Sequence, residues 1–143
     1  MINPLTVIYN CLNGAIFSFP EAVSLSHSLI EEASRVILKL PQLQSSSQQS
    51  SKAKEEIEEI RKMFIPQALE NKVKEIVEIT KDNNSSMKQD VGMGRETEIQ
   101  YINGWVVRKG EELGVQTEAN KRVVEAVTWR AKVVEKYTRD SGL

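Results

Sequence analysis

The chain has 143 residues, of which 40% are hydrophobic and 27% are charged, and its formal net charge is −1. This length and composition are typical of a single globular domain, residues 1–143, with a sizeable core. The near-neutral charge gives no electrostatic attraction to nucleic acid or to an anionic membrane, so neither is expected as a partner. No apolar run approaches the roughly 18 residues that a membrane span requires.

The cysteine content bears on the cellular compartment. Cys11 is the one cysteine of the chain and cannot form an internal disulfide, which favours a reducing compartment. The first residues also lack the basic segment that opens a secretory signal peptide. The sequence therefore predicts a cytoplasmic location.

The first predicted element is a short, mostly apolar helix over residues 3–14. Asn3 is suited to the N-cap, Pro4 to the first turn and Gly14 to the left-handed position after the helix. Because chain termini usually fray, a buried helix this close to the first residue suggests that the chain belongs to something longer.

A second helix is predicted over residues 20–40, with Pro41 ending it. Its apolar residues recur at three- and four-residue steps, which is one face of a helix: Ala22, Leu25, Leu29, Ala33, Val36, Ile37 and Leu40. His27 lies in this helix. We interpret it as a surface or boundary histidine, because no second histidine or acidic cluster accompanies it to hold a metal, and no metal site is expected.

Residues 42–54, QLQSSSQQSSKAK, are of low complexity and predict a loop. The run EEIEEIRKMF then resumes a helix, Pro66 interrupts it, and a further helix continues to Thr80. The charges of residues 55–62 are typical of a solvated helix face with short-range ion pairs.

Two glycines organise the polar stretch that follows. Ser85 or Ser86 can cap a short helix that ends near Asp90, and Gly92 and Gly94 break it, since glycine is costly inside a helix. A new helix then opens at residues 97–98.

This break affects where Ser86 and Glu98 point. One continuous helix would hold the two residues about 18 Å apart along its axis. With the chain turning back at the glycines, both side chains can face one cleft.

Two helices complete the chain, with Gly114 between them and Thr117 as a candidate N-cap of the last. No segment alternates apolar and polar residues over a useful length, so no strand is predicted. The predicted fold class is all-α, a compact bundle of about six helices.

Several blocks, in this order and spacing, carry a family resemblance: INPLT with NG following, SSMKQD, GRETEIQYINGWVV and ELGVQT. Together they resemble the C-terminal domain of ketopantoate reductase, the 2-dehydropantoate 2-reductase family. The matched blocks extend from Ile2 to about Asn120, and residues 41–66 contribute nothing to the resemblance. The resemblance implies the helical fold of the 6-phosphogluconate-dehydrogenase-like C-terminal domain.

The resemblance also implies a function. Family members reduce 2-dehydropantoate, a 2-oxo acid, to pantoate with NADPH, on the way to pantothenate and coenzyme A. An N-terminal Rossmann domain carries the dinucleotide, and the helical domain closes over the substrate. Members commonly pair through the helical domain, so a homodimer is expected.

The resemblance carries four substrate-contacting residues over to this sequence: Asn3, Asn13, Ser86 and Glu98. Ser86 would bind the substrate carboxylate and Glu98 would hydrogen-bond the substrate hydroxyl. Two further matches are interpreted as structural. Asp90 would make a cap or helix-turn contact, and Asn103 would make an interhelical hydrogen bond.

Other family features do not occur in this sequence. No GxGxxG fingerprint of a dinucleotide site is found, so the chain alone is not expected to bind NADPH. The family's catalytic lysine lies a few residues before the INPLT block, ahead of Met1, so no catalytic residue is expected in this chain. The chain alone is therefore expected to be inactive.

Three interpretations follow. The chain is the substrate-binding part of a reductase, or a free-standing helical protein that kept the fold for dimerisation or assembly and lost the chemistry. The third is an enzyme completed by a separate Rossmann chain. Retention of all four substrate-contacting residues favours the first, because polar groups without partners cost stability and a purely structural protein has no need for them.

Overall fold

The computed structural model describes residues 2–46 and 48–140, and the regular secondary structure of these residues is entirely helical. This confirms the all-α prediction. Where the sequence predicted about six helices, the described residues form seven α-helices and two short 3₁₀ helices, here called η1 and η2. They are α1 (Asn3–Tyr9), η1 (Asn13–Ser18), α2 (Pro20–Leu38), η2 (Pro41–Leu43), α3 (Ser51–Met63), α4 (Pro66–Ile79), α5 (Ser86–Gly92), α6 (Ile99–Leu113) and α7 (Glu118–Asp140).

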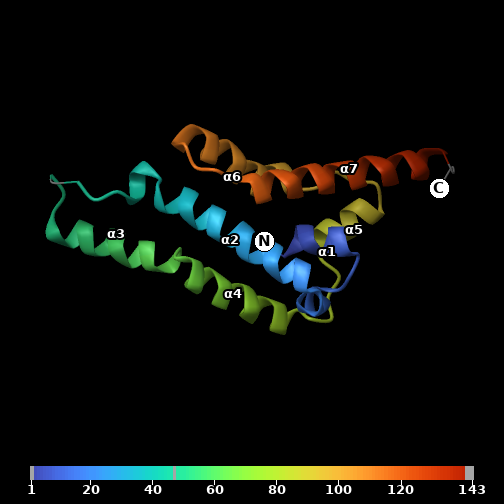
Figure 1. Cartoon of the computed structure of the whole chain (residues 1–143), viewed down its shortest axis with the longest axis horizontal. Coiled ribbons are helices and arrows are strands. Elements are labelled where there is room, and N and C mark those ends of the chain that lie inside the picture. The colour runs from blue at the N-terminus through green and yellow to red at the C-terminus, as the bar shows by residue number, and fades with distance from the viewer. Residues whose placement is uncertain (1, 47, 141–143) are drawn as a thin grey trace.

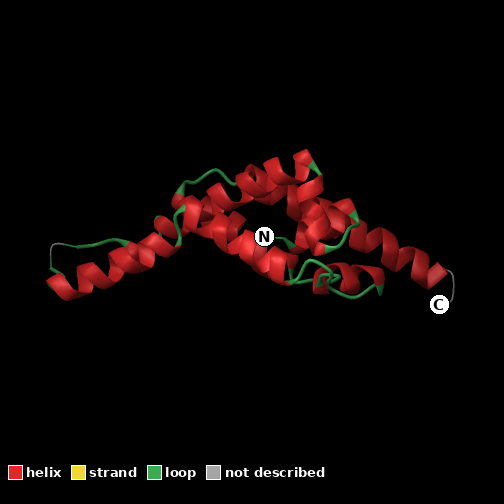
Figure 2. Ribbon diagram, turned by 90° about the horizontal axis from the view of Figure 1, so that it is seen from below, coloured by secondary structure: helices red, strands yellow, loops and turns green. Residues whose placement is uncertain are grey.

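The helices surround the short helix α1. α6 packs along α7 on one side of the molecule, and α4 lies against α2 on the other (Figure 1). α1 contacts α2, α5, α7 and η1. At opposite ends of the molecule, α3 and the last turns of α7 reach away from the other helices (Figure 2). Among the described residues, no helix has both the length and the apolarity of a membrane span.

The main hydrophobic cluster explains why α1 is helical at all. A helix of seven residues is not stable alone in water, so α1 depends on tertiary packing. Its apolar side chains join residues from most of the other helices in one buried cluster: Ile2, Leu5, Val7, Ile16, Ala22, Leu29, Val77, Met87, Val91, Ile99, Val123 and Val127. A smaller cluster, Ala33, Val36 and Val106, joins α2 to α6.

The predicted first helix is too long. α1 ends at Tyr9, and Asn10 takes the left-handed conformation, with φ of 50°, that the sequence had assigned to Gly14. Asparagine is one of the few residues that tolerate this conformation, so an Asn can end a helix as a glycine does. Residues 13–18 then form η1.

The predicted N-cap of α1 is also wrong. Ile2, not Asn3, stands before the helix, and its backbone is already helical, with φ of −81° and ψ of −44°. The carbonyl of Ile2 accepts the N–H groups of Leu5 and Thr6 at 2.9 and 3.2 Å. Asn3 therefore lies inside the first turn, and its side chain is free for other contacts.

The predicted loop over residues 42–54 is shorter in the structure. η2 occupies its start, and α3 begins at Ser51, where the Ser50 hydroxyl accepts the Ala53 N–H at 3.2 Å. Serine is a strong N-cap, and residues 52–54, Lys-Ala-Lys, favour a helix. The low-complexity composition of the segment hid this helix start from the sequence analysis. In the same way α2 ends at Leu38, slightly before the predicted residue 40.

Three other local predictions agree with the structure. α5 ends at Gly92, and Gly94 in the following turn has a φ of 65°. His27 is exposed. Residues 55–62 line an exposed helix face with an ion pair between Lys62 and Glu59 at 2.6 Å.

A buried carboxylate links three of the long helices. Glu32 of α2 accepts the N–H groups of Ala119 and Asn120 at 2.8 and 2.9 Å, so it caps the start of α7. The Asn120 side chain donates to Glu32 at 2.7 Å and accepts from Asn103 of α6 at 3.0 Å. The interhelical hydrogen bond predicted for Asn103 is therefore confirmed.

We expect Glu32→Ala to lower the free energy of unfolding by about 3 kcal/mol, because it leaves buried N–H groups at the start of α7 without an acceptor. Glu31→Ala is the matched control. It removes an exposed carboxylate from the neighbouring position and should change stability by less than about 0.5 kcal/mol. Urea denaturation measures both. Equal effects of the two substitutions would contradict the capping role of Glu32.

Candidate functional site

Two buried hydroxyls join α1 to the start of α5. The Thr6 hydroxyl donates to the Asn3 carbonyl at 2.7 Å and lies 2.5 Å from the Ser85 hydroxyl. Because the single proton of Thr6 is used on Asn3, Ser85 is the donor in the second bond. The Ser85 oxygen in turn accepts the Lys88 N–H at 3.2 Å and is the N-cap of α5. Ser86 is therefore not needed as a cap, and its side chain is exposed.

Glu98 stands at the N-cap position of α6. Its carbonyl accepts the N–H groups of Tyr101 and Ile102 at 2.9 and 3.1 Å, while its side chain makes no capping bond. The carboxylate is exposed, and within the described part of the chain it has no hydrogen-bond or ion-pair partner. It is available to a ligand.

The core brings the segments that carry three predicted site residues to one place. Asn3, Ser86 and Glu98 come from the starts of α1, α5 and α6. Each is the chain neighbour of a buried member of the main cluster: Ile2, Met87 and Ile99, respectively. Segments almost a hundred residues apart in sequence are thus packed around one core.

Asn13 begins η1 and is buried. Its side-chain amide donates to the Thr80 hydroxyl at 3.0 Å, and its N–H donates to the Asn83 carbonyl at 3.1 Å. These bonds attach η1 to the segment that leads into α5. The Asn13 Oδ1 atom is buried and has no partner in the described structure. A buried acceptor without a partner lowers the stability of the folded state by about 1–3 kcal/mol unless a ligand or a water molecule donates a hydrogen bond to it.

Gly14 permits the close contact that holds Asn13. Its N–H donates to the Lys81 carbonyl at 2.9 Å, and a Cβ at this position would lie 2.6 Å from the Cβ of Lys81. No larger residue fits here without moving η1 away from the turn.

The four predicted side chains do not bond to one another among the described residues. Asn3 lines a cavity of about 600 Å³ between the start of α1 and helices α2, α4 and α6, which we call the α1 groove. Asn13, Ser86 and Glu98 are not among the residues that line it. The cleft in which Ser86 and Glu98 would meet a substrate therefore stays a prediction.

The α1 groove is largely apolar, and one of its lining residues has an unsatisfied polar atom. Ile37, Val73 and Ile102 contribute to its walls. Asn103 also lines it, is fully buried and donates to Asn120, but its Oδ1 atom has no partner in the described structure. The groove thus offers mainly apolar surface beside the first turn of α1.

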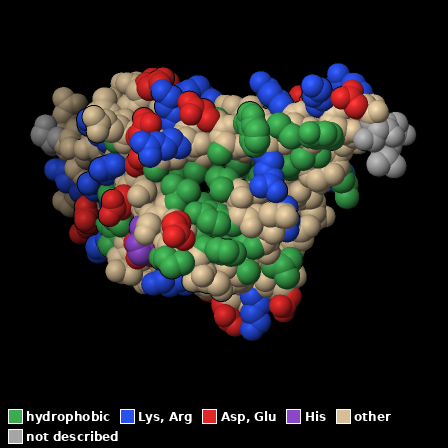
Figure 3. Space-filling model, turned by 45° about the vertical axis from the view of Figure 1, so that its right-hand side comes forward, with side chains coloured by type: hydrophobic (Ala, Val, Ile, Leu, Met, Phe, Trp, Pro, Cys, Tyr) green, Lys and Arg blue, Asp and Glu red, His purple; other side chains and the backbone are tan. Residues whose placement is uncertain are grey.

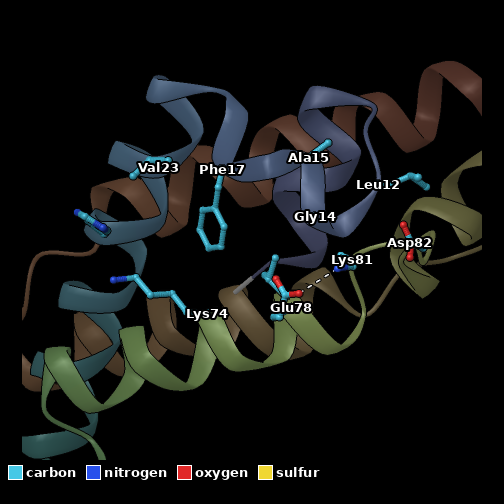
Figure 4. A pocket seen from close by; sticks show the side chains of 11 residues that line it. Leu12, Gly14, Ala15, Phe17, Val23, Lys74, Glu78, Lys81 and Asp82 are labelled. Carbon is cyan, nitrogen blue, oxygen red and sulfur yellow. Dashed lines mark hydrogen bonds and ion pairs between the residues drawn. The ribbon is translucent and has the colours of Figure 1, made fainter.

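A second groove, of about 880 Å³, lies between η1, α2 and α4 (Figure 4). The Phe17 ring reaches into it, and Lys81 pairs with Glu78 at its edge at 3.0 Å. Hydrophobic side chains gather over the middle of the face shown in Figure 3. The described residues contain no group of three or more His, Cys, Asp and Glu side chains that could hold a metal ion.

Comparison with known proteins decides the family. The family described as "Ketopantoate reductase PanE/ApbA C terminal" matches residues 1–131. The chain belongs to this family. The resemblance carried by the INPLT, SSMKQD and GRETEIQYINGWVV blocks is thereby confirmed.

Two curated relatives show the extent of the similarity. The 2-dehydropantoate 2-reductase of Vibrio cholerae is 33% identical over 126 residues, which are 88% of this chain and 36% of the relative. A probable 2-dehydropantoate 2-reductase of Schizosaccharomyces pombe is 32% identical over 123 residues, or 86% of this chain and 33% of the relative. This ketopantoate reductase C-terminal domain thus spans about a third of the length of these relatives.

Solved structures share the fold. A PanE/ApbA family ketopantoate reductase from Ralstonia eutropha JMP134 matches with a TM-score of 0.63 and 20% identity, over 93% of this chain and 38% of that one. D-mandelate dehydrogenase, solved with NADH and anilino(oxo)acetate, matches with a TM-score of 0.62 and 23% identity, over 93% and 37%. Because the same helical fold occurs in both enzymes, the fold by itself does not select the substrate.

We expect Gly14→Ala to lower the free energy of unfolding by about 1–3 kcal/mol, because the added methyl group overlaps Lys81. Gly92→Ala is the matched control, since a Cβ there meets nothing within 4 Å. This control should be neutral or stabilise by up to about 1 kcal/mol. Thermal unfolding of the two variants tests the contact, and equal melting temperatures would contradict it.

Proposed function

We propose that this chain is the substrate-binding domain of an NADPH-dependent 2-dehydropantoate 2-reductase that acts in the cytoplasm in pantothenate biosynthesis. One observation carries the proposal beyond family membership. Asn3, Ser86 and Glu98 make no side-chain hydrogen bonds within the described residues, and Asn13 has an unsatisfied acceptor. Each residue expected to contact the substrate thus has hydrogen-bonding capacity that the described residues do not use.

The proposed chemistry assigns each polar group a role in holding a 2-oxo acid. The Ser86 hydroxyl donates to the substrate carboxylate, and the Glu98 carboxylate accepts from the substrate hydroxyl. Asn3 and Asn13 orient the substrate through their amides. A charge-assisted bond to Glu98 is the strongest of these contacts, because hydrogen bonds to ionised groups are about twice as strong as neutral ones.

The reduction itself requires groups that we place outside this chain. NADPH supplies the hydride when bound, but the sequence has no GxGxxG fingerprint to hold it. The described residues likewise offer helices and no strand–glycine loop–helix unit. The chain's own contribution in this proposal is to bind and orient the 2-oxo acid.

The α1 groove supports a place in a longer enzyme. The backbone of Ile2 is helical and α1 begins without a side-chain cap, so the helix can continue upstream without rearrangement. Such a helix would begin beside the groove, because Ile2 and Asn3 are among its lining residues. Relatives about three times as long as the matched region fit such an arrangement.

Exposed apolar side chains support a homodimer formed through this domain. Tyr101, Trp129 and Ile79 are 81%, 68% and 74% exposed. Aromatic residues of this kind are enriched in protein interfaces. The same observation favours the second candidate function, a free-standing dimerisation or assembly protein, which would not need Ser86 and Glu98.

We expect Glu98→Ala to lower kcat/KM by about 10- to 150-fold, the loss of one charge-assisted hydrogen bond worth roughly 1.5–3 kcal/mol. Ser86→Ala should lower kcat/KM by about fivefold, mainly by raising KM, because a neutral donor to the carboxylate stabilises the ground state and the transition state equally. Steady-state kinetics with ketopantoate and NADPH measure both, using this chain fused to the part of the Vibrio cholerae relative that lies outside the matched region.

Glu96→Ala is the matched control, because Glu96 is an exposed carboxylate two residues away, and its kinetics should not change. Both site residues are exposed, so the variants should fold. The assignment of Glu98 fails if Glu98→Ala leaves the kinetics unchanged but lowers the melting temperature by several degrees. Glu98 would then act only as a charge at the start of α6.

A further inference from the structure

A further hollow, of about 600 Å³, lies between α1, α5 and α7, at the end of α1 opposite the α1 groove. Its lining is more basic than that of the α1 groove. Two cationic side chains, Lys88 of α5 and Arg130 of α7, line it together with the amides of Asn10, Asn84 and Gln89. Valines from the three helices form its apolar walls. We call this hollow the basic pocket.

The positive charge of the basic pocket is not neutralised by its walls. No aspartate or glutamate is among the lining residues. Asp90, on the same helix as Lys88, is paired with Arg95, whose Nε and Nη2 atoms lie 2.9 and 2.7 Å from the Asp90 Oδ1. Two half-buried cations therefore share a hollow without a carboxylate in it.

Both cations contact the end of α1 and retain spare donors. Lys88 donates to the Cys11 carbonyl and Arg130 to the Ile8 carbonyl, each at the long distance of 3.3 Å. Cations are favourable at the C-terminal end of a helix, which explains part of their placement. A lysine has three N–H donors and an arginine five, so two and four donors stay available. The one hydrogen bond that each side chain makes therefore leaves most of its donors unused.

The field of Lys88 reaches its surroundings. Burial raises the pKa of the Cys11 thiol, and the positive charge of Lys88 opposes that rise. An anion entering the pocket would meet two cations and three amide side chains.

We propose that the basic pocket binds a small organic anion, with a carboxylate or phosphate head held by Lys88 and Arg130 and a short apolar body against the valines. The arginine fork matches either head group with two parallel hydrogen bonds. The amides of Asn10, Asn84 and Gln89 supply further donors.

The basic pocket is separate from the proposed substrate site. Asn3 begins α1 and Asn10 follows its end, so the two lie roughly 10 Å apart along the helix axis. Ser86 and Lys88 are two residues apart on α5, which turns their side chains about 200° from each other. An anion can therefore occupy the basic pocket while the proposed substrate site is empty.

The test is a titration of the chain with acetate, hexanoate and inorganic phosphate at low salt, followed by backbone amide chemical shifts. We expect saturable shifts at Lys88, Gln89 and Gly92. Hexanoate should bind at least about tenfold more tightly than acetate, because its methylene groups contact the valines. Phosphate binding more tightly than acetate identifies a phosphate head, and the reverse order identifies a carboxylate.

Variants locate the site. Arg130→Gln and Lys88→Gln should each weaken hexanoate binding by about tenfold or more, whereas Arg130→Lys should weaken it less. Arg122→Gln is the matched control, because it removes an exposed arginine of the same helix and should leave binding unchanged. Since Arg130 also bonds to α1, circular dichroism checks that each variant is folded, and Lys88→Gln provides a second, independent variant.

Two results would overturn the proposal. One is the absence of saturable shifts with any of the three anions up to about 10 mM. The other is hexanoate binding that survives Arg130→Gln and Lys88→Gln in folded protein but is lost in Ser86→Ala. In that case the anion occupies the proposed substrate site, and the basic pocket serves only to cap α1.

Discussion

The contact between the Thr6 and Ser85 hydroxyls joins the two shortest α-helices of the described structure, and the proposed site depends on it. α1 and α5 have seven residues each, too few to be stable alone. Their helical state relies on burial in the main cluster and on this pair of hydroxyls, which lie 2.5 Å apart. Because Ser85 takes the capping role, Ser86 is left free at the surface. The hydrogen bond from the Lys88 N–H to the Ser85 hydroxyl thus engages Ser85 and leaves the adjacent Ser86 unengaged.

Buried hydrogen bonds also connect the surrounding helices. Glu32 joins α2 to the start of α7, and Asn13 joins η1 to Thr80 after α4. A buried network of this kind stabilises only when its members are satisfied. The unsatisfied Oδ1 atoms of Asn13 and Asn103 are the exceptions in the described structure. Asn103 is one of the residues that line the α1 groove, and Asn13 belongs to the proposed substrate set.

The sequence predicted the elements whose signals are local. Hydrophobic periodicity located α2, α4, α6 and α7, and the Ser-Ser pair and glycines located α5. The sequence-based prediction placed the end of α1 wrongly because two nearby residues can both adopt the left-handed conformation that ends a helix. Asn10, and not Gly14, ends α1. The prediction also failed where the partner is remote. Glu32 caps α7 across 88 residues of sequence, and no pattern within either helix reveals that pairing.

The same distinction applies to the site. Asn3, Ser86 and Glu98 could be named from motifs shared with a family, and the structure adds that their side chains are unengaged. The basic pocket could not be predicted, because Lys88 and Arg130 belong to helices that meet only in the folded chain. Each residue by itself resembles an ordinary surface charge on an amphipathic helix.

The central claim is that Ser86 and Glu98 hold the two ends of one 2-oxo acid or its reduced product. The most direct measurement is a crystal structure of the fusion protein proposed for the kinetic test, in complex with pantoate. The account predicts the pantoate carboxylate within hydrogen-bond distance of the Ser86 hydroxyl and the pantoate hydroxyl within hydrogen-bond distance of the Glu98 carboxylate. Pantoate bound where neither side chain reaches it, for example in the groove beside Phe17, would contradict the account.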